Sequence, residues 1–96
     1  MQYSYEITPR PAELGGGWRL QLLEDGNEAG GGVFPIPAED PHVGMTWWNG
    51  MSEKERARWL KIAKSARPAD ARQAWCEAEA YNDAEQEAYA WLDSRG

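Results

Sequence analysis

The hydrophobic pattern of the chain changes its period at three closely spaced prolines, Pro35, Pro37 and Pro41. Before them, apolar and polar residues alternate, which is typical of strands with one buried face. After them, apolar residues recur every three or four positions, which is typical of amphipathic helices. Because proline fixes φ and lacks an N–H donor, residues 34–42 are predicted to form a linker without regular structure. Strands followed by helices in one short chain predict an α+β fold.

The residues before the linker are predicted to form a three-stranded antiparallel sheet. In the first strand Tyr3, Tyr5 and Ile7 alternate with polar residues, so the large side chains share one face. Glycine and proline clusters separate the strands and favour turns between them. The predicted strands lie near residues 2–8, 17–24 and 28–34.

Asp25-Gly26 predicts a tight hairpin between the second and third strands, because a type I′ turn needs positive φ at both central residues. A two-residue turn pairs Glu24 with Asn27. The resulting register places large residues opposite small ones, so that a helix can approach the third strand closely. The expected pairs are Leu22 with Ala29, Leu20 with Gly31 and Trp18 with Val33.

After the linker, two main helices are predicted near residues 52–66 and 69–93, with a short helical turn near 44–49. Ser52 and Glu55 form a capping box at the start of the first main helix. Its apolar stripe is predicted to be the surface on which the sheet and the last helix pack. That stripe consists of Trp59, Ile62, Ala63 and Ala66.

The last helix is predicted to be a single long helix with room for a kink near Asn82, because Glu85 interrupts its apolar stripe. A break is the alternative, with Asn82 capping a final helix and Glu85 closing a second capping box. Cys76 falls on the polar side of this helix. The predicted stripe consists of Ala71, Ala74, Trp75, Ala78, Tyr81, Ala88 and Leu92.

The 96 residues are predicted to form a single domain, residues 1–96. Cys76 is the only cysteine, which suits a reducing cytoplasm. The first residues lack the basic and apolar regions of a signal peptide. No apolar run approaches the roughly 18 residues of a membrane-spanning helix. We therefore expect a cytoplasmic protein that makes no contact with membranes.

The charged residues are unevenly distributed along a chain whose net charge is −6. Residues 54–72 contain seven of the ten basic residues and only two acidic ones, which gives a net charge of +5. Residues 1–53 and 73–96 carry net charges of −6 and −5. A chain of this overall sign repels nucleic acid and attracts a basic surface on another protein. The alternative is that the acidic residues only increase solubility.

No catalytic, cofactor-binding or metal-binding set is predicted. His42 is the only histidine that a histidine-based triad could use, and it stands beside a proline with no cysteine nearby, so it is predicted to be a surface residue and not a ligand or a base. Cys76 has no histidine close in sequence, and no metal-ligand spacing occurs. Gly30-Gly31-Gly32 leads into a strand and lacks the phosphate-loop pattern. We expect a protein that is not an enzyme and needs no cofactor.

Two binding surfaces remain as alternatives. Acidic residues on the last helix and at the hairpin tip could imitate a row of phosphates, because successive helical turns space carboxylates about 5–6 Å apart. The acidic residues of this predicted surface are Glu77, Glu79, Asp83, Glu87, Glu24, Asp25 and Glu28. Alternatively, the basic helix could contact nucleic-acid phosphates through Lys54, Arg58, Lys61 and Lys64, although the net charge opposes such binding.

Most of the chain resembles a family of short accessory proteins carried by bacterial conjugative plasmids and integrated mobile elements. The resemblance lies in GGGWRLQLLEDGNEAGGGVFP, TWWNGMSEKERARWL and ARPADARQAW, followed by AEAYNDAEQEAYAWL. Small acidic proteins of such elements include anti-CRISPR inhibitors, some of which mimic DNA. The resemblance therefore implies an inhibitor that covers a basic nucleic-acid-binding site of a CRISPR effector complex. The exposure of Trp47 and Trp48, the target and the oligomeric state remain open at this point.

Overall fold

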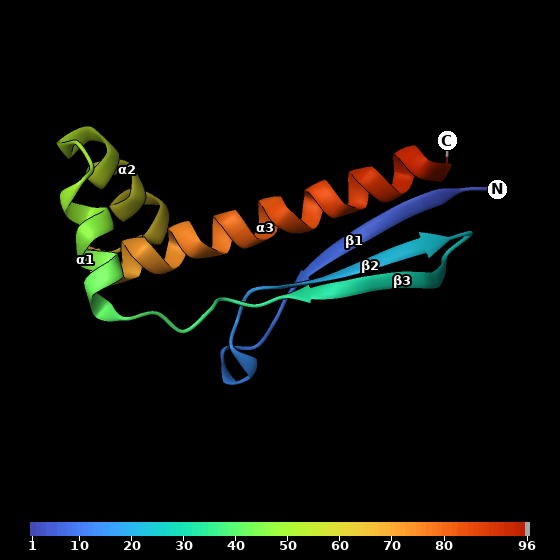
Figure 1. The fold of residues 1–96 in the computed structure, drawn as a ribbon, viewed down its shortest axis with the longest axis horizontal. Helices are drawn as coiled ribbons and strands as arrows, with labels where there is room; N and C mark the ends of the chain where they lie inside the picture. Colours follow the sequence, from blue (N-terminus) through green and yellow to red (C-terminus); the bar gives the residue numbers. More distant parts are fainter. Residues whose placement is uncertain (96) are drawn as a thin grey trace. The chain divides into compact units, whose positions relative to one another are not determined.

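A computed structural model describes residues 1–95, which form one sheet and three α-helices (Figure 1). The α+β class is therefore confirmed. No helix within residues 1–95 combines the length and apolar character needed to cross a membrane. The elements are β1 (Tyr3–Pro9), the 3-10 helix η1 (Ala12–Leu14), β2 (Trp18–Glu24), β3 (Asn27–Phe34), α1 (Pro41–Asn49), α2 (Glu53–Ala63) and α3 (Pro68–Arg95).

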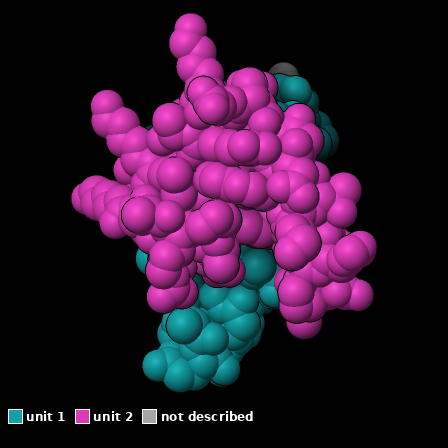
Figure 2. Space-filling model, turned by 90° about the vertical axis from the view of Figure 1, so that its left-hand side faces the viewer, with its two compact units in different colours: residues 1–36, 79–96 teal, residues 37–78 magenta. Residues whose placement is uncertain are grey.

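The chain divides into two compact units, shown in two colours in Figure 2. Unit 1 consists of residues 1–36 and 79–96, and unit 2 of residues 37–78. Helix α3 contributes its first part to unit 2 and its longer second part to unit 1. The single domain over residues 1–96 stays a prediction.

In unit 1 the strands lie in the order β1-β2-β3, and both neighbouring pairs are antiparallel. Asp25 and Gly26 form the tight turn between β2 and β3, with φ values of 53° and 84°. The Asp25 carboxylate also accepts a hydrogen bond from the Gln2 backbone N–H at 2.8 Å. The predicted I′ hairpin is therefore confirmed, and its first residue also fixes the start of β1.

The predicted register of β3 is wrong by one residue beyond the turn. Glu24 pairs with Asn27 as expected, but a β-bulge leaves Ala29 as an extra residue in β3. Because side chains alternate along a strand, one extra residue moves all following side chains to the other face. Val33 is consequently 53% exposed and Phe34 packs against the core. The observed pairs are Leu22 with Gly30, Leu20 with Gly32 and Trp18 with Phe34.

The core of unit 1 lies between the sheet and α3 and includes Leu20 and Leu22 of β2. Buried alanines on α3 let the helix lie close to the sheet, and its aromatic side chains pack edge-to-face against the strands. Such aromatic pairs stabilise by about 0.5–1.5 kcal/mol each beyond burial. The helix contributes Ala84 and Ala88 to the core, and the aromatic pairs are Trp18–Tyr81, Tyr3–Trp91 and Tyr5–Tyr89.

Unit 2 contains α1, α2 and the first part of α3. Helix α1 is longer than predicted because Pro41, placed in the linker by the sequence, occupies its first turn, where proline is well tolerated. At the start of α2 the Ser52 hydroxyl accepts from the Glu55 N–H at 3.2 Å, as the capping box predicts. Helix α2 ends early, at Lys64 in the left-handed conformation with φ 53°.

The predicted packing role of α2 is wrong. None of its residues is buried, Ile62 is 51% exposed, and Ala66 lies beyond the helix and is also exposed. Trp59 and Ala63 are half-buried. The main core of residues 1–95 instead uses α3, because small residues at its buried positions allow closer approach than the side chains of α2.

Helix α3 is continuous from Pro68 to Arg95, so the alternative with a break at Asn82 is excluded. Two details of its predicted stripe are wrong: Ala78 is exposed, and Cys76 is buried. Figure 1 shows the helix as one uninterrupted ribbon.

Candidate functional site

Three carboxylates form a row along the part of α3 that belongs to unit 1. Glu79, Asp83 and Glu87 are spaced four residues apart, and all three side chains belong to exposed residues. Four-residue spacing places neighbours on successive turns of one helix face, about 5–6 Å apart. Within residues 1–95 none of the three forms an ion pair. We call these three residues the acidic row.

The acidic residues of the hairpin do not join the acidic row. They surround the β2–β3 turn, four residues along β2 from Leu20, which pairs with Gly32 beside the Glu87 carboxylate. At about 3.3 Å per residue the nearest end of the acidic row is roughly 13 Å from the turn. Asp25 is already engaged with Gln2 and Glu28 pairs with Arg19 at 3.4 Å, whereas Glu24 is half-buried.

Glu77 also stands apart from the acidic row. It belongs to unit 2, is half-buried and already has an interaction partner. The structure therefore places three of the seven predicted residues, Glu79, Asp83 and Glu87, together on one exposed surface.

The charges of the chain are separated between the two units. Unit 1 contains ten acidic and three basic residues, which gives it a net charge of −7. Unit 2 contains six acidic and seven basic residues and carries a net charge of +1. Unit 1 alone thus carries the negative potential that attracts a basic partner.

The four basic residues predicted to contact nucleic acid are all exposed. The guanidinium carbon of Arg58 lies 5.6 Å from the centre of the Trp59 ring. Lys64 is the C-cap residue of α2. Arg56 plays a different part, because its Nε donates to the Trp48 carbonyl at 2.9 Å and its guanidinium lies over the Trp48 ring. The exposed set along and just after α2 consists of Lys54, Arg58, Lys61 and Lys64.

Arg72 is the centre of a half-buried cluster in unit 2 that the sequence analysis missed. Its Nε donates to one Glu39 oxygen at 2.9 Å, and a second guanidinium nitrogen donates to the other oxygen. The guanidinium carbon lies 5.2 Å from the Trp47 ring centre and 4.4 Å from that of Trp75. The hydrogen bonds from Arg72 hold the pKa of Glu39 below its ordinary value, and Glu39 raises the pKa of Arg72.

Cys76 borders this cluster, and its position corrects the prediction that it lies on the polar side of α3. Its Sγ donates to Glu39 Oε1 at 3.7 Å, and the residue is buried. Burial raises the pKa of the thiol, so the reactive thiolate is disfavoured. The cysteine is therefore a packing residue of unit 2.

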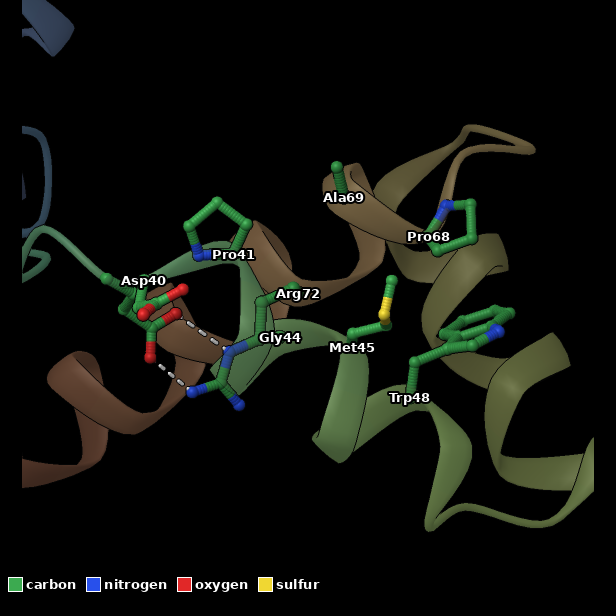
Figure 3. A pocket seen from close by; sticks show the side chains of 9 residues that line it. Asp40, Pro41, Gly44, Met45, Trp48, Pro68, Ala69 and Arg72 are labelled. Carbon is green, nitrogen blue, oxygen red and sulfur yellow. Dashed lines mark hydrogen bonds and ion pairs between the residues drawn. The ribbon is translucent and has the colours of Figure 1, made fainter.

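A pocket of about 530 Å³ opens beside Arg72 and extends to Trp48 (Figure 3). Helix α1 and the first turn of α3 supply its mostly apolar walls, and the preceding linker supplies Glu39 and Asp40 at one end. Trp47 and Trp48 are both half-buried, which answers the question of their exposure. The other lining residues are Pro41, Gly44, Met45, Pro68 and Ala69.

His42 is exposed and donates its backbone N–H to Asp40 Oδ1 at 2.9 Å, which caps α1. Among residues 1–95 no three His, Cys, Asp or Glu side chains are grouped to hold a metal ion.

Searches with the chain found no match among models of protein families, curated proteins or solved structures.

Proposed function

We propose that the protein is a non-enzymatic inhibitor from a mobile genetic element that covers a basic nucleic-acid-binding surface of a CRISPR effector complex. The acidic row supports this proposal most directly, because it presents three exposed carboxylates in a unit of net charge −7. The choice of a CRISPR effector comes from the resemblance to mobile-element accessory proteins.

The proposed mechanism is occlusion by charge complementarity. A basic groove that binds DNA presents lysine and arginine side chains spaced for phosphates. Carboxylates on successive helical turns meet such side chains at a comparable spacing. Charges of this kind increase the association rate and fix the orientation of the partner more than they increase affinity.

Charge reversal tests this mechanism. Replacing Glu79, Asp83 and Glu87 by lysine should weaken binding to the effector by at least about tenfold, mainly through slower association. The control variant reverses the charges of Glu6 and Glu13 by the same replacement with lysine. Both are exposed acidic residues of unit 1 outside the acidic row. Binding and inhibition of DNA cleavage are measured over a panel of purified effector complexes.

If the row and control variants lose binding equally per charge, net charge alone matters and the acidic row has no special role. If the row variant keeps full binding, occlusion through this surface is wrong.

The second candidate function is weak nucleic-acid binding through the exposed basic side chains of Lys54, Arg58, Lys61 and Lys64. Four phosphate contacts predict a slope of about −3.6 for log K against log salt. Anisotropy with a labelled DNA duplex at low salt measures this directly. Absence of DNA binding supports the proposed inhibitor. The second function is supported if the slope has that size and its magnitude falls by about one unit in the Arg58→Ala variant.

A further inference from the structure

We propose that the pocket of unit 2 binds a segment of a partner protein that presents an apolar side chain beside an arginine or lysine. The basic character of that partner rests on the proposed function, whereas the pocket itself belongs to a different unit from the acidic row. Two properties of the pocket select this occupant.

The first property is an apolar wall that the chain leaves open. Met45 is 59% exposed at its edge, and the half-buried Trp48 ring lies toward the end opposite Asp40 (Figure 3). A volume of about 530 Å³ lies within the range of pockets that bind small ligands or side-chain anchors. Proline and alanine from α1 and α3 complete the wall, so a leucine-sized side chain finds apolar contacts there.

The second property is an unbalanced negative charge at one end. Arg72 contributes the only positive charge among the lining residues, and both of its hydrogen bonds in this region go to Glu39. The negative charge of Asp40 is therefore not balanced by Arg72, and within the described chain Asp40 forms no ion pair. Its Oδ1 accepts the α1 capping bond, and Oδ2 is the oxygen that we propose pairs with a ligand cation. An anionic ligand would meet two carboxylates and an arginine that is already paired.

Three blocked dipeptides test this assignment by two-dimensional NMR titration of the full-length chain. Acetyl-leucyl-arginine amide carries the apolar and cationic groups together, the citrulline analogue removes the charge, and the glutamate analogue reverses it. We expect shifts confined to the pocket, at the Trp48 indole N–H and the backbone of Gly44, Met45 and Ala69. The arginine peptide should bind about two- to fivefold more tightly than the citrulline peptide, and the glutamate peptide most weakly.

Two variants with one matched control identify the site. Asp40→Asn keeps the helix cap, since asparagine caps as well as aspartate, and should make the arginine and citrulline peptides bind equally. Ala69→Phe fills the pocket and should abolish binding of both. Ala57→Phe adds the same ring to an exposed position of α2 that does not line the pocket, and should leave binding unchanged.

Equal binding of the arginine and citrulline peptides to the natural chain would refute the cationic part of the proposal. Shifts outside the pocket, or full binding by Ala69→Phe, would refute the site. Because no effector complex is present in this titration, its failure leaves the acidic-row proposal intact. Conversely, if the acidic-row variant binds the effector as tightly as the natural chain does, the expected peptide binding to the pocket is unchanged.

Discussion

Removal of the Arg72–Glu39 ion pair should destabilise unit 2 more than removal of any exposed ion pair. Both side chains are largely shielded from water, with exposed fractions of 15% for Arg72 and 25% for Glu39. Two parallel hydrogen bonds join the guanidinium to the carboxylate. The variants are Arg72→Met, which keeps an apolar side chain, and Glu39→Gln, which keeps the shape.

The expected coupling energy between the two positions is about 1.5–3 kcal/mol, the usual contribution of hydrogen bonds to charged groups. The contacts of Arg72 with Trp47 and Trp75 add about 0.5–1 kcal/mol each to the cost of the Arg72→Met variant. They do not enter the coupling energy, because they are lost in both the single and the double variant.

Urea unfolding of the four proteins of this double-mutant cycle, followed by tryptophan fluorescence, measures the coupling energy. The matched control is the cycle for Arg19 and Glu28, whose side chains are 54% and 52% exposed. Exposed pairs of this kind contribute about 0.2–1 kcal/mol. Coupling between Arg72 and Glu39 no larger than in this control would refute the claim that partial burial strengthens the pair.

The same pair predicts a pH dependence. Because Arg72 lowers the pKa of Glu39 below its ordinary value of 4.5, the unfolded chain binds the proton first as the pH falls. The stabilisation is thus complete above that pH and is lost as the pH falls through the lower pKa of the folded chain. The stability difference between the natural chain and Glu39→Gln should shrink below about pH 4.5. A difference that stays constant in that range would contradict this linkage.

Three further substitutions test packing and backbone geometry by urea unfolding. Leu20→Ala should cost about 2–5 kcal/mol, because Leu20 is 1% exposed and is the largest fully buried side chain in the described chain. Gly17→Ala should cost more than about 2 kcal/mol, since φ is 78° and a Cβ there would overlap the Phe34 carbonyl oxygen. Gly44→Ala should instead stabilise α1 by about 0.5–1 kcal/mol, because the added Cβ meets only ordinary contacts. A loss of stability in Gly44→Ala, or none in the other two, would contradict the geometry described here.

Local signals in the sequence were sufficient for much of the fold. Alternation in β1, the Asp25-Gly26 turn and the Ser52 cap each depend on neighbouring residues, and the structure confirms all three. The register of β3 was mispredicted, because the glycine-rich strand carries few side chains that would reveal a bulge at Ala29. The periodicity of α2 predicts a packing role for this helix, but periodicity within one helix says nothing about whether another element covers its apolar face.

The candidate sites show the same division between local and distant information. The four-residue spacing of the acidic row was readable from the sequence. The distance between that row and the hairpin tip was not, because it follows from which part of α3 covers which end of β2. The Arg72 cluster was also hidden, since Glu39 lies 33 residues earlier in a segment predicted to be a plain linker. A proline-rich linker gives no periodic signal from which a partner can be inferred.

The separation of charge between the units determines how binding experiments on this chain can be interpreted. A variant that changes only the net charge of the chain alters attraction to any basic partner, whichever surface it uses. The acidic row lies in the unit of charge −7, whereas the pocket and the basic side chains of α2 lie in the unit of charge +1. Paired substitutions of equal charge, one in each unit, therefore separate a specific surface from general electrostatic attraction. Only a surface in direct contact with the partner should affect the dissociation rate as well as the association rate.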